Sequence, residues 1–286
     1  NGTNNGTNNG TNNGTNNGTN NGTNNGTNNG ANNGGACQEN LTFVGQVFTS
    51  AEPDPLSPNG GMPTTAPYDE GYDCGLEALV AAVPTSGDEP DNMATVDFQL
   101  SECTVVATYY NSENQPVPRA NREFWLADGK AAIKVFFFAG EDENDPARLN
   151  HPDFNVKVGQ KISVSATGVT NFSGLPELTS VTEGSWSLDS EDNSVSIWDA
   201  TGSDLTQDDV NRLVRVTGQL SGEPTDCGGN FKCYDLDHGA SNVVTLRTSS
   251  QFVEGGQCVT YVGPVGTFGG SVQLNAANFD WLWTNE

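Results

Sequence analysis

The residues with the most evident chemistry are asparagines in an Asn-Gly-Thr-Asn repeat at the start of the chain. Seven copies fill residues 1–28, and an eighth at 29–32 has Ala in place of Thr. Each Asn-Gly-Thr is an acceptor for N-linked glycan, and seven in perfect register exceed chance. Thr can carry O-linked sugar, so the linked atom stays open. The expected glycosylation sites, including two single acceptor sequences further on, are Asn1, Asn5, Asn9, Asn13, Asn17, Asn21, Asn25, Asn40 and Asn171.

Six cysteines are the second chemically informative group. An even number of cysteines beside glycan acceptors favours disulfides and an oxidising extracellular setting, with free buried thiols as the alternative. Cys227 and Cys233 enclose a Gly-Gly-Asn turn, and we expect them to form a local disulfide. Among the several possible connectivities, the pairs that would complete the set are Cys74–Cys103 and Cys37–Cys258.

Little in the sequence indicates catalysis. His151 and His238 are the two histidines, and neither accompanies a Ser or Cys in a recognised motif. The cysteines lack zinc-site spacing. Acidic clusters at 88–91 and 141–145 could bind calcium, but they lack the calcium-loop pattern, and a charge run is usually a solvated face. We therefore expect no enzyme, no catalytic residue, no metal site and no cofactor other than covalent glycans, with calcium as the open alternative.

The charge balance limits the partners that we expect. The chain has 286 residues with 36 acidic and 11 basic side chains, a net charge of −25. All of these charges follow residue 38, because the repeat has none. Such a body should repel phosphate backbones, which predicts no nucleic-acid partner. The sequence also contains no apolar run long enough for a membrane-spanning helix.

Composition divides the chain into four parts. Residues 1–36 read as an extended, glycosylated tail, because Asn, Gly and Thr cannot build a core. A disordered linker is the alternative, and we favour a sugar-covered polyproline-II-like chain over a docked strand. Residues 37–93 read as an irregular lead-in with one strand, in which 76–82 fits either a helix turn or a strand. Two β domains, 94–190 and 191–286, follow.

Each β domain shows one long strand, a hairpin and a final pair of strands. Alternating apolar residues predict strands near 96–110, 123–127, 131–138, 158–169 and 176–181. Asp128-Gly129 is a strong hairpin signal between the second and third of these. The pattern recurs loosely in the second domain, in the segments 212–220, 231–236, 242–248, 258–262 and 271–274.

These segments resemble the tandem OB-fold modules of secreted bacterial proteins. The resemblance rests on Phe-Trp-Leu-Ala-Asp-Gly at 124–129, Val-Gly-Gln-Lys-Ile-Ser-Val at 158–164 and Val-Arg-Val-Thr-Gly at 214–218. It implies an all-β fold of two OB-like barrels in tandem behind the tail, with a β-sandwich as the alternative. It also implies a possible ligand face on the second and third strands.

In the first domain this face would contain Trp125 and the phenylalanines at 136–138, together with Lys130 and Lys134. We interpret these mostly as core aromatics with solvated lysines. However, three consecutive phenylalanines cannot all point into one core, because side chains alternate along a strand. At least one of them should face outward.

Two functions compete. The repeat resembles the tetrapeptide-repeat glycofibrils of environmental microbial material, which implies a structural subunit of an extracellular glycan-coated filament. In this interpretation the chain forms an open helical or linear homopolymer through its β body and its tail. The alternative is a secreted tandem OB-fold module that binds glycans and carries a glycosylated stalk. Both functions make glycans a partner and place the protein outside the cell.

Overall fold

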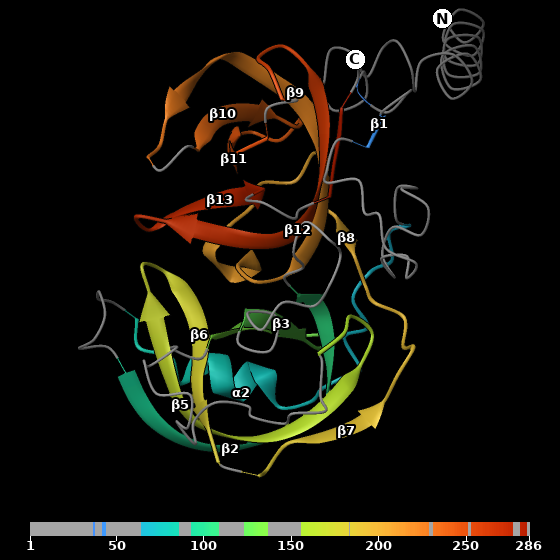
Figure 1. The fold of residues 1–286 in the computed structure, drawn as a ribbon, viewed down its shortest axis with the longest axis vertical. Coiled ribbons are helices and arrows are strands. Elements are labelled where there is room, and N and C mark those ends of the chain that lie inside the picture. The colour runs from blue at the N-terminus through green and yellow to red at the C-terminus, as the bar shows by residue number, and fades with distance from the viewer. Residues whose placement is uncertain are drawn as a thin grey trace, which may run out of the picture.

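Two closed β-barrels lie one above the other along the long axis of the molecule (Figure 1). The computed structural model describes residue 37 and residues 42–43, 64–85, 93–108, 123–136, 156–182, 184–228, 231–250, 253–276 and 281–284. The expected all-β fold with two OB-like barrels is therefore confirmed. The β-sandwich alternative is wrong, because each sheet closes on itself.

Barrel 1 is built from the strands of the first β domain. These are β2 (Met93–Thr108), β3 (Glu123–Ala127), β4 (Ala132–Phe136), β5 (Lys161–Phe172) and β6 (Leu175–Val181). They pair in the order β2-β3-β4-β6-β5, and β5 returns to β2. Only β4 and β6 pair in parallel. The short strand β7 (Ser187–Ser190) extends the sheet beside β5.

Barrel 2 repeats this order. Its strands are β9 (Leu213–Asp226), β10 (Lys232–Asp237), β11 (Val244–Thr248), β12 (Cys258–Phe268) and β13 (Ser271–Ala276). β11 and β13 are the parallel pair, and β12 closes on β9. Three short strands extend this sheet: β8 (Trp198–Asp199) beside β9, β14 (Trp281–Thr284) beside β12, and β1 (Thr42–Phe43) beside β14. The sequence prediction lacks β8 and β14, whereas β1 lies in the lead-in, where one strand was expected.

The lead-in contributes to the core of barrel 1. Its ambiguous segment is a helix, α2 (Leu76–Ala81), whose Leu76 and Leu79 are fully buried. Both leucines join the apolar cluster formed by inward side chains such as Phe124 and Ile133. A second short helical segment, the 3-10 turn η4 (Gln207–Asp209), precedes β9. None of the described helices has the length and apolar character that a bilayer crossing requires.

A third apolar cluster joins the barrels. Its buried members are Val106, Ala107, Ala127, Ala132 and Val158 from barrel 1, and Ile197, Leu213, Val262 and Trp283 from barrel 2 and the segment that leads into it. Because these residues come from the outer surfaces of both barrels, the barrels form one packed body.

Three disulfides connect the described segments, and all six cysteines are paired. Cys74–Cys103 ties the lead-in to β2, Cys227–Cys233 spans the β9–β10 turn, and Cys37 bonds to Cys258 of β12. These are the pairs named from the sequence. Three disulfides fit an oxidising compartment.

Several predicted features lie outside the described residues. They are residues 1–36 with their seven acceptor asparagines, Asn40, the acidic clusters at 88–91 and 141–145, His151, and Phe137 and Phe138.

Candidate ligand-binding face on barrel 2

The second and third strands of each barrel turn alternate side chains outward, on the face where barrels of this type bind oligonucleotides or oligosaccharides. In barrel 1, Phe124 and Val135 point into the core, whereas Trp125, Lys134 and Phe136 occupy the outward positions. The prediction that at least one phenylalanine of 136–138 faces outward therefore holds for Phe136.

Barrel 2 covers much of this face of barrel 1. Trp125 packs against the cluster between the barrels, and its Nε1 donates a hydrogen bond of 3.1 Å to Asn211 Oδ1. Ala127 and Ala132 are buried in the same cluster. Part of this possible ligand face of barrel 1 is thus a contact between the barrels.

Of the two lysines predicted to be solvated, Lys130 is exposed, whereas Lys134 is nearly buried, contrary to our interpretation of the sequence. Lys134 is 11% exposed, and its Nζ lies 2.8 Å from Glu123 Oε1 and 3.2 Å from Glu177 Oε1. Lys130 is 37% exposed and pairs with Asp73, at 2.7 Å. The hydrogen bond from Lys130 holds the pKa of the Asp73 carboxyl below its usual value.

The corresponding face of barrel 2 presents a group of aromatic and polar side chains, which are half-buried except for one exposed phenylalanine. Arg247 points outward from β11, with its Cζ 3.7 Å from the ring centre of Phe231 and 5.9 Å from that of Phe268. Phe268 is 62% exposed. Asn275 lies beside Arg247 on the parallel strand β13. We call Phe231, Arg247, Phe268 and Asn275 the Arg247 platform.

The guanidinium of Arg247 has N–H donors that are not used in hydrogen bonds with the residues that the structure describes. Its Nη1 makes a long hydrogen bond of 3.5 Å to Asn275 Oδ1, and its buried Nε has no hydrogen-bond partner. Burial lowers the pKa of the Arg247 guanidinium, but arginine stays charged in proteins. The unpartnered Nε is closed to solvent, so the donors that a ligand could reach are those on the Nη atoms of Arg247.

Arg247 and Lys134 occupy corresponding places in the two barrels. Each projects outward from the third strand, each lies beside the parallel fifth strand, and each contacts aromatic rings. The neighbour on the fifth strand is Glu177 for Lys134 but the uncharged Asn275 for Arg247. Lys134 therefore forms ion pairs with two carboxylates of barrel 1. Arg247 forms no ion pair with any residue that the structure describes, and its charge is available to a ligand. Superposing the two predicted strand patterns would have pointed to Arg247.

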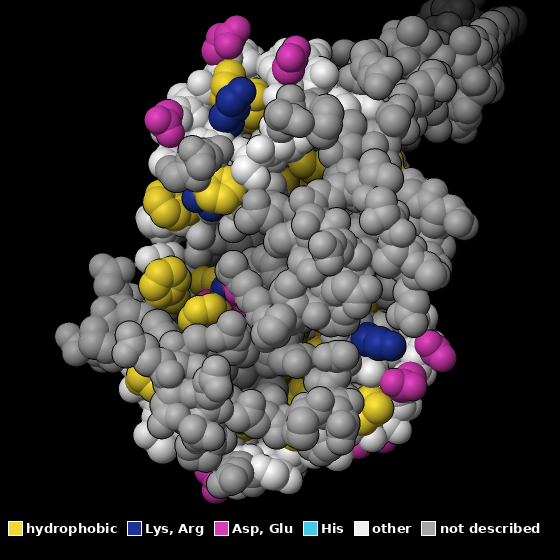
Figure 2. All heavy atoms as spheres, in the orientation of Figure 1, with side chains coloured by type: hydrophobic (Ala, Val, Ile, Leu, Met, Phe, Trp, Pro, Cys, Tyr) yellow, Lys and Arg dark blue, Asp and Glu magenta, His cyan; other side chains and the backbone are white. Residues whose placement is uncertain are grey.

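The platform lies close to the junction of the barrels. Thr267 Oγ1 and Gly270 N donate hydrogen bonds of 3.0 and 3.3 Å to the Ser173 carbonyl, so the β12–β13 turn meets the β5–β6 turn. Phe172, beside that contact, is 49% exposed. Figure 2 shows hydrophobic side chains on both sides of this junction, with basic side chains among them. The exposed aromatic surface thus continues from barrel 2 onto barrel 1.

Asn171 is the one expected glycosylation site among the described residues. It lies near the end of β5, where its amide nitrogen donates to the Pro84 carbonyl at 2.9 Å. Its amide oxygen accepts from Gly174 N at 2.7 Å and so closes the β5–β6 turn. The folded domain uses both ends of this amide, and glycosylation at Asn171 stays a prediction.

His238 has a structural position. It is buried, and its ring nitrogens face the carbonyls of Ser203, at 3.0 Å, and Leu236, at 3.4 Å. These contacts fix the turn after β10. Within the described ranges, no group of three or more His, Cys, Asp or Glu side chains is placed to hold a metal ion.

No family model matches the sequence, and no curated protein does. Among solved structures, the chain is similar to HIN domains. These include the tetrameric p202 HIN2 (14% identity, 70% of this chain and 100% of that chain, TM-score 0.31). The Ifi202 HINa domain in complex with 20bp dsDNA shows 10% identity and a TM-score of 0.32, and the match covers 68% of this chain and 99% of that chain. A murine DNA binding protein bound with ds DNA shows 11% identity and a TM-score of 0.32, and the match covers 66% of this chain and 95% of that chain.

These structures correct one expectation. We excluded nucleic acid as a partner from net charge, but two of the similar structures are complexes with double-stranded DNA. The exclusion is therefore wrong. Net charge averages over the whole surface, whereas binding depends on the local charge at one face. Similarity at this level assigns no ligand to this chain.

Proposed function

We propose that this chain is an extracellular carbohydrate-binding protein whose Arg247 platform holds a neutral oligosaccharide. The observation that supports this most strongly is the Arg247 guanidinium, which lies over the rings of two phenylalanines and forms no ion pair with any described residue. The three disulfides agree with a secreted protein.

The chemistry of the platform suits a sugar. An aromatic ring carries partial negative charge on its face, against which the C–H groups of a pyranose can pack. Arg247 donates and Asn275 both donates and accepts, which matches sugar hydroxyls. A polyanion would need several cations along its path, whereas a neutral sugar needs none. The exposed rings of Phe172 and Phe268, on either side of the junction, would allow contact with more than one sugar unit.

A second candidate function rests on the Asn-Gly-Thr-Asn repeat. A tail that carries sugar at seven sites could act as the connector of a glycan-coated filament, with the barrels as its heads. Head-to-tail contacts of this kind generate open chains, not closed rings, when their rotation does not close. Negative-stain microscopy of the full chain tests this proposal, because filaments support it and separate particles contradict it.

The carbohydrate proposal is tested by screening the full chain against neutral oligosaccharides and then titrating the best ligand by calorimetry. We expect Phe268→Ala to weaken binding about tenfold, as loss of one stacking ring does in other proteins. Arg247→Ala should weaken it at least as much. Leu188→Ala is the matched control, because Leu188 is an apolar side chain on β7 that is 40% exposed and lies in the other barrel.

Two results would contradict the proposal. One is that no oligosaccharide binds, or that the platform variants bind as the wild-type protein does. The other is that single- or double-stranded oligonucleotides bind instead and lose affinity in the same variants, which would make the platform a nucleic-acid site.

A further inference from the structure

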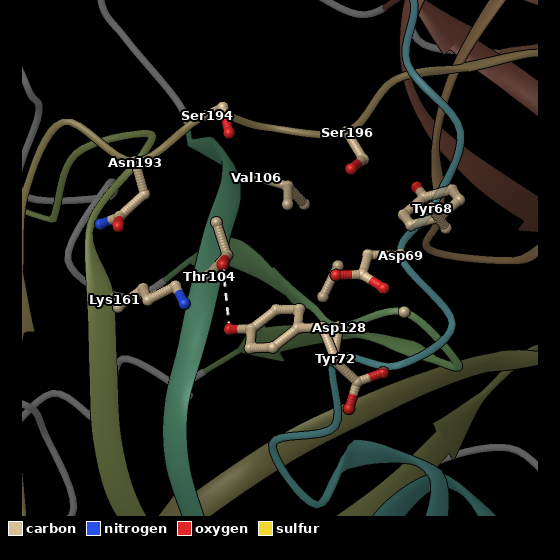
Figure 3. Close-up of a pocket in the computed structure, with 12 residues that line it drawn as sticks. Tyr68, Asp69, Tyr72, Thr104, Val106, Asp128, Lys161, Asn193, Ser194 and Ser196 are labelled. Atoms are coloured by element: carbon tan, nitrogen blue, oxygen red, sulfur yellow. Dashed lines mark hydrogen bonds between the residues drawn. The ribbon is translucent and has the colours of Figure 1, made fainter.

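A polar pocket of about 270 Å³ lies on barrel 1, away from the Arg247 platform. Its walls come from the lead-in, from β2, from the β3–β4 turn, from the start of β5 and from the segment between β7 and β8 (Figure 3). None of the platform residues lines it. The side chains used below are Tyr68, Asp69, Tyr72, Lys161, Ser194 and Ser196.

The walls are held firmly. The buried carboxylate of Asp128 accepts hydrogen bonds from the backbone nitrogens of Cys74, Leu76, Lys130 and Ala131, at 2.8–3.3 Å. These four donors fix the lead-in against the β3–β4 turn and compensate the charge of that carboxylate. The Cys74–Cys103 disulfide in addition ties the lead-in to β2. A pocket with such walls exists before a ligand arrives, which lowers the entropic cost of binding.

Close packing also fixes the floor of the pocket. The Gly129 backbone nitrogen donates a hydrogen bond of 2.8 Å to the Tyr72 carbonyl. A Cβ at Gly129 would collide with the carbonyl oxygen of Asp69. The Tyr72 hydroxyl contacts Thr104 Oγ1 at 3.0 Å and also donates to the Glu102 carbonyl. Tyr72 therefore presents its ring to the pocket in one orientation.

Lys161 supplies a cation at one end. Its Nζ lies 4.4 Å from the ring centre of Tyr72, and it forms no ion pair with any residue in the described ranges. This is notable in a chain with 36 acidic and 11 basic residues, where Lys130 and Lys134 each have two carboxylate partners. An ammonium held over an aromatic ring without a carboxylate can bind an anionic ligand group.

The other end of the pocket suits hydroxyl groups. Asp69 and Tyr68 lie beyond the Tyr72 ring from Lys161, and the hydroxyls of Ser194 and Ser196 point toward the space between (Figure 3). The Asp69 carboxylate accepts one hydrogen bond from Gly71 N, at 3.0 Å, which leaves it acceptor capacity. A carboxylate among hydroxyls can accept hydrogen bonds from a polyol, but it would repel a second anionic group.

We propose that this pocket binds a small carboxylate-bearing sugar, the chemical class of the uronic acids. The ligand carboxylate lies at Lys161, a ring face packs beside Tyr72, and the hydroxyls reach Asp69, Ser194 and Ser196. This site is separate from the Arg247 platform, so either site can fail while the other stands.

Calorimetric titration of the full chain with glucuronate, glucose and acetate tests the assignment. We expect glucuronate to bind at least about tenfold more tightly than glucose, because a charge-assisted hydrogen bond contributes roughly that factor. It should also bind more tightly than acetate, which has the carboxylate but lacks the ring and the hydroxyls. Lys161→Met should lower glucuronate affinity about tenfold. Lys157→Met is the matched control, because Lys157 is an exposed lysine four residues earlier that does not line the pocket.

Ser196→Ala tests the hydroxyl end, and it should weaken glucuronate but not acetate. Thermal unfolding of each variant shows whether the fold is intact. Equal affinity for glucuronate and glucose, or unchanged binding by Lys161→Met, would overturn the proposal. Equal binding of acetate and glucuronate would reduce the site to a simple anion pocket and overturn the sugar assignment. Phe268→Ala should leave glucuronate binding unchanged, which separates this test from that of the platform.

Discussion

Trp125 and Asn211 join the two barrels through one hydrogen bond between side chains 86 residues apart in sequence. Asn211 also donates through Nδ2 to the Pro176 carbonyl at 2.9 Å, and its backbone is left-handed, with a φ of 71°. It is fully buried. One amide side chain therefore fixes the angle at which barrel 2 covers the outer face of barrel 1.

Replacing this amide should destabilise the whole body. Asn211→Ala removes the partners of Trp125 Nε1 and the Pro176 carbonyl and places a strained residue at positive φ, so we expect a loss of about 2–4 kcal/mol in denaturant unfolding. Asn211→Gly should cost about 1 kcal/mol less, because glycine adopts this backbone freely. Equal losses for both variants would show that strain contributes nothing.

The buried cluster around Lys134 gives a second prediction. Glu123 and Glu177 have side chains only 3% and 4% exposed. Lys134→Met removes the cation between them, and we expect a loss of about 3–5 kcal/mol in the free energy of unfolding. The triple variant that also carries Glu123→Gln and Glu177→Gln should recover part of that loss. Lys130→Met, on the exposed surface, is the control and should change little.

The disulfides should differ in their contribution to stability. Cys74 and Cys103 are 29 residues apart, whereas Cys227 and Cys233 are separated by 6. Loop-closure entropy predicts about 3.6 kcal/mol for the first bond and about 2.2 kcal/mol for the second. Unfolding of the two double-alanine variants measures the difference. A larger effect at the short loop would contradict the prediction.

Tyr68 gives a prediction about alkaline pH. Burial raises the pKa of its hydroxyl above the usual value, and the hydroxyl donates to the Leu213 carbonyl at 3.1 Å. In the unfolded chain tyrosine ionises near about pH 10. The stability that comes from the neutral hydroxyl is therefore present below that pH and is lost as pH rises above it. The advantage of the wild-type protein over Tyr68→Phe in urea unfolding should shrink between about pH 9 and 11. A constant difference would contradict this.

The repeat can be tested by mass. We expect the intact secreted protein to exceed its peptide mass, with sugar at the seven acceptor asparagines from Asn1 to Asn25 or at the adjacent threonines. Asn29 should be bare if the linkage is through asparagine, because Ala31 replaces the required hydroxyl residue. A mass equal to that of the peptide alone would exclude glycosylation.

Much of the fold could be predicted because its signals are local. Asp128-Gly129 marked the β3–β4 hairpin, and the structure shows why the aspartate is there, since its carboxylate binds four backbone nitrogens. Alternation located the barrel strands. It did not decide α2, because one helical turn has too few residues for its period to differ clearly from a strand. It also missed β14, a strand of four residues.

The sites were harder to predict. The Arg247 platform brings together the residue before β10 and residues near the ends of β11, β12 and β13, and no sequence spacing predicts that proximity. The pocket beside Lys161 draws on five separate segments. The sequence also could not show that Trp125 packs against the second barrel, because that contact joins residues 86 apart.

The buried alanines Ala127 and Ala132 have a consequence for barrel 1 when it is produced without barrel 2. Small side chains there let the second barrel approach closely, and without it they would leave an apolar patch on the first barrel open to water. A gene fragment encoding barrel 1 alone should thus yield a self-associating product.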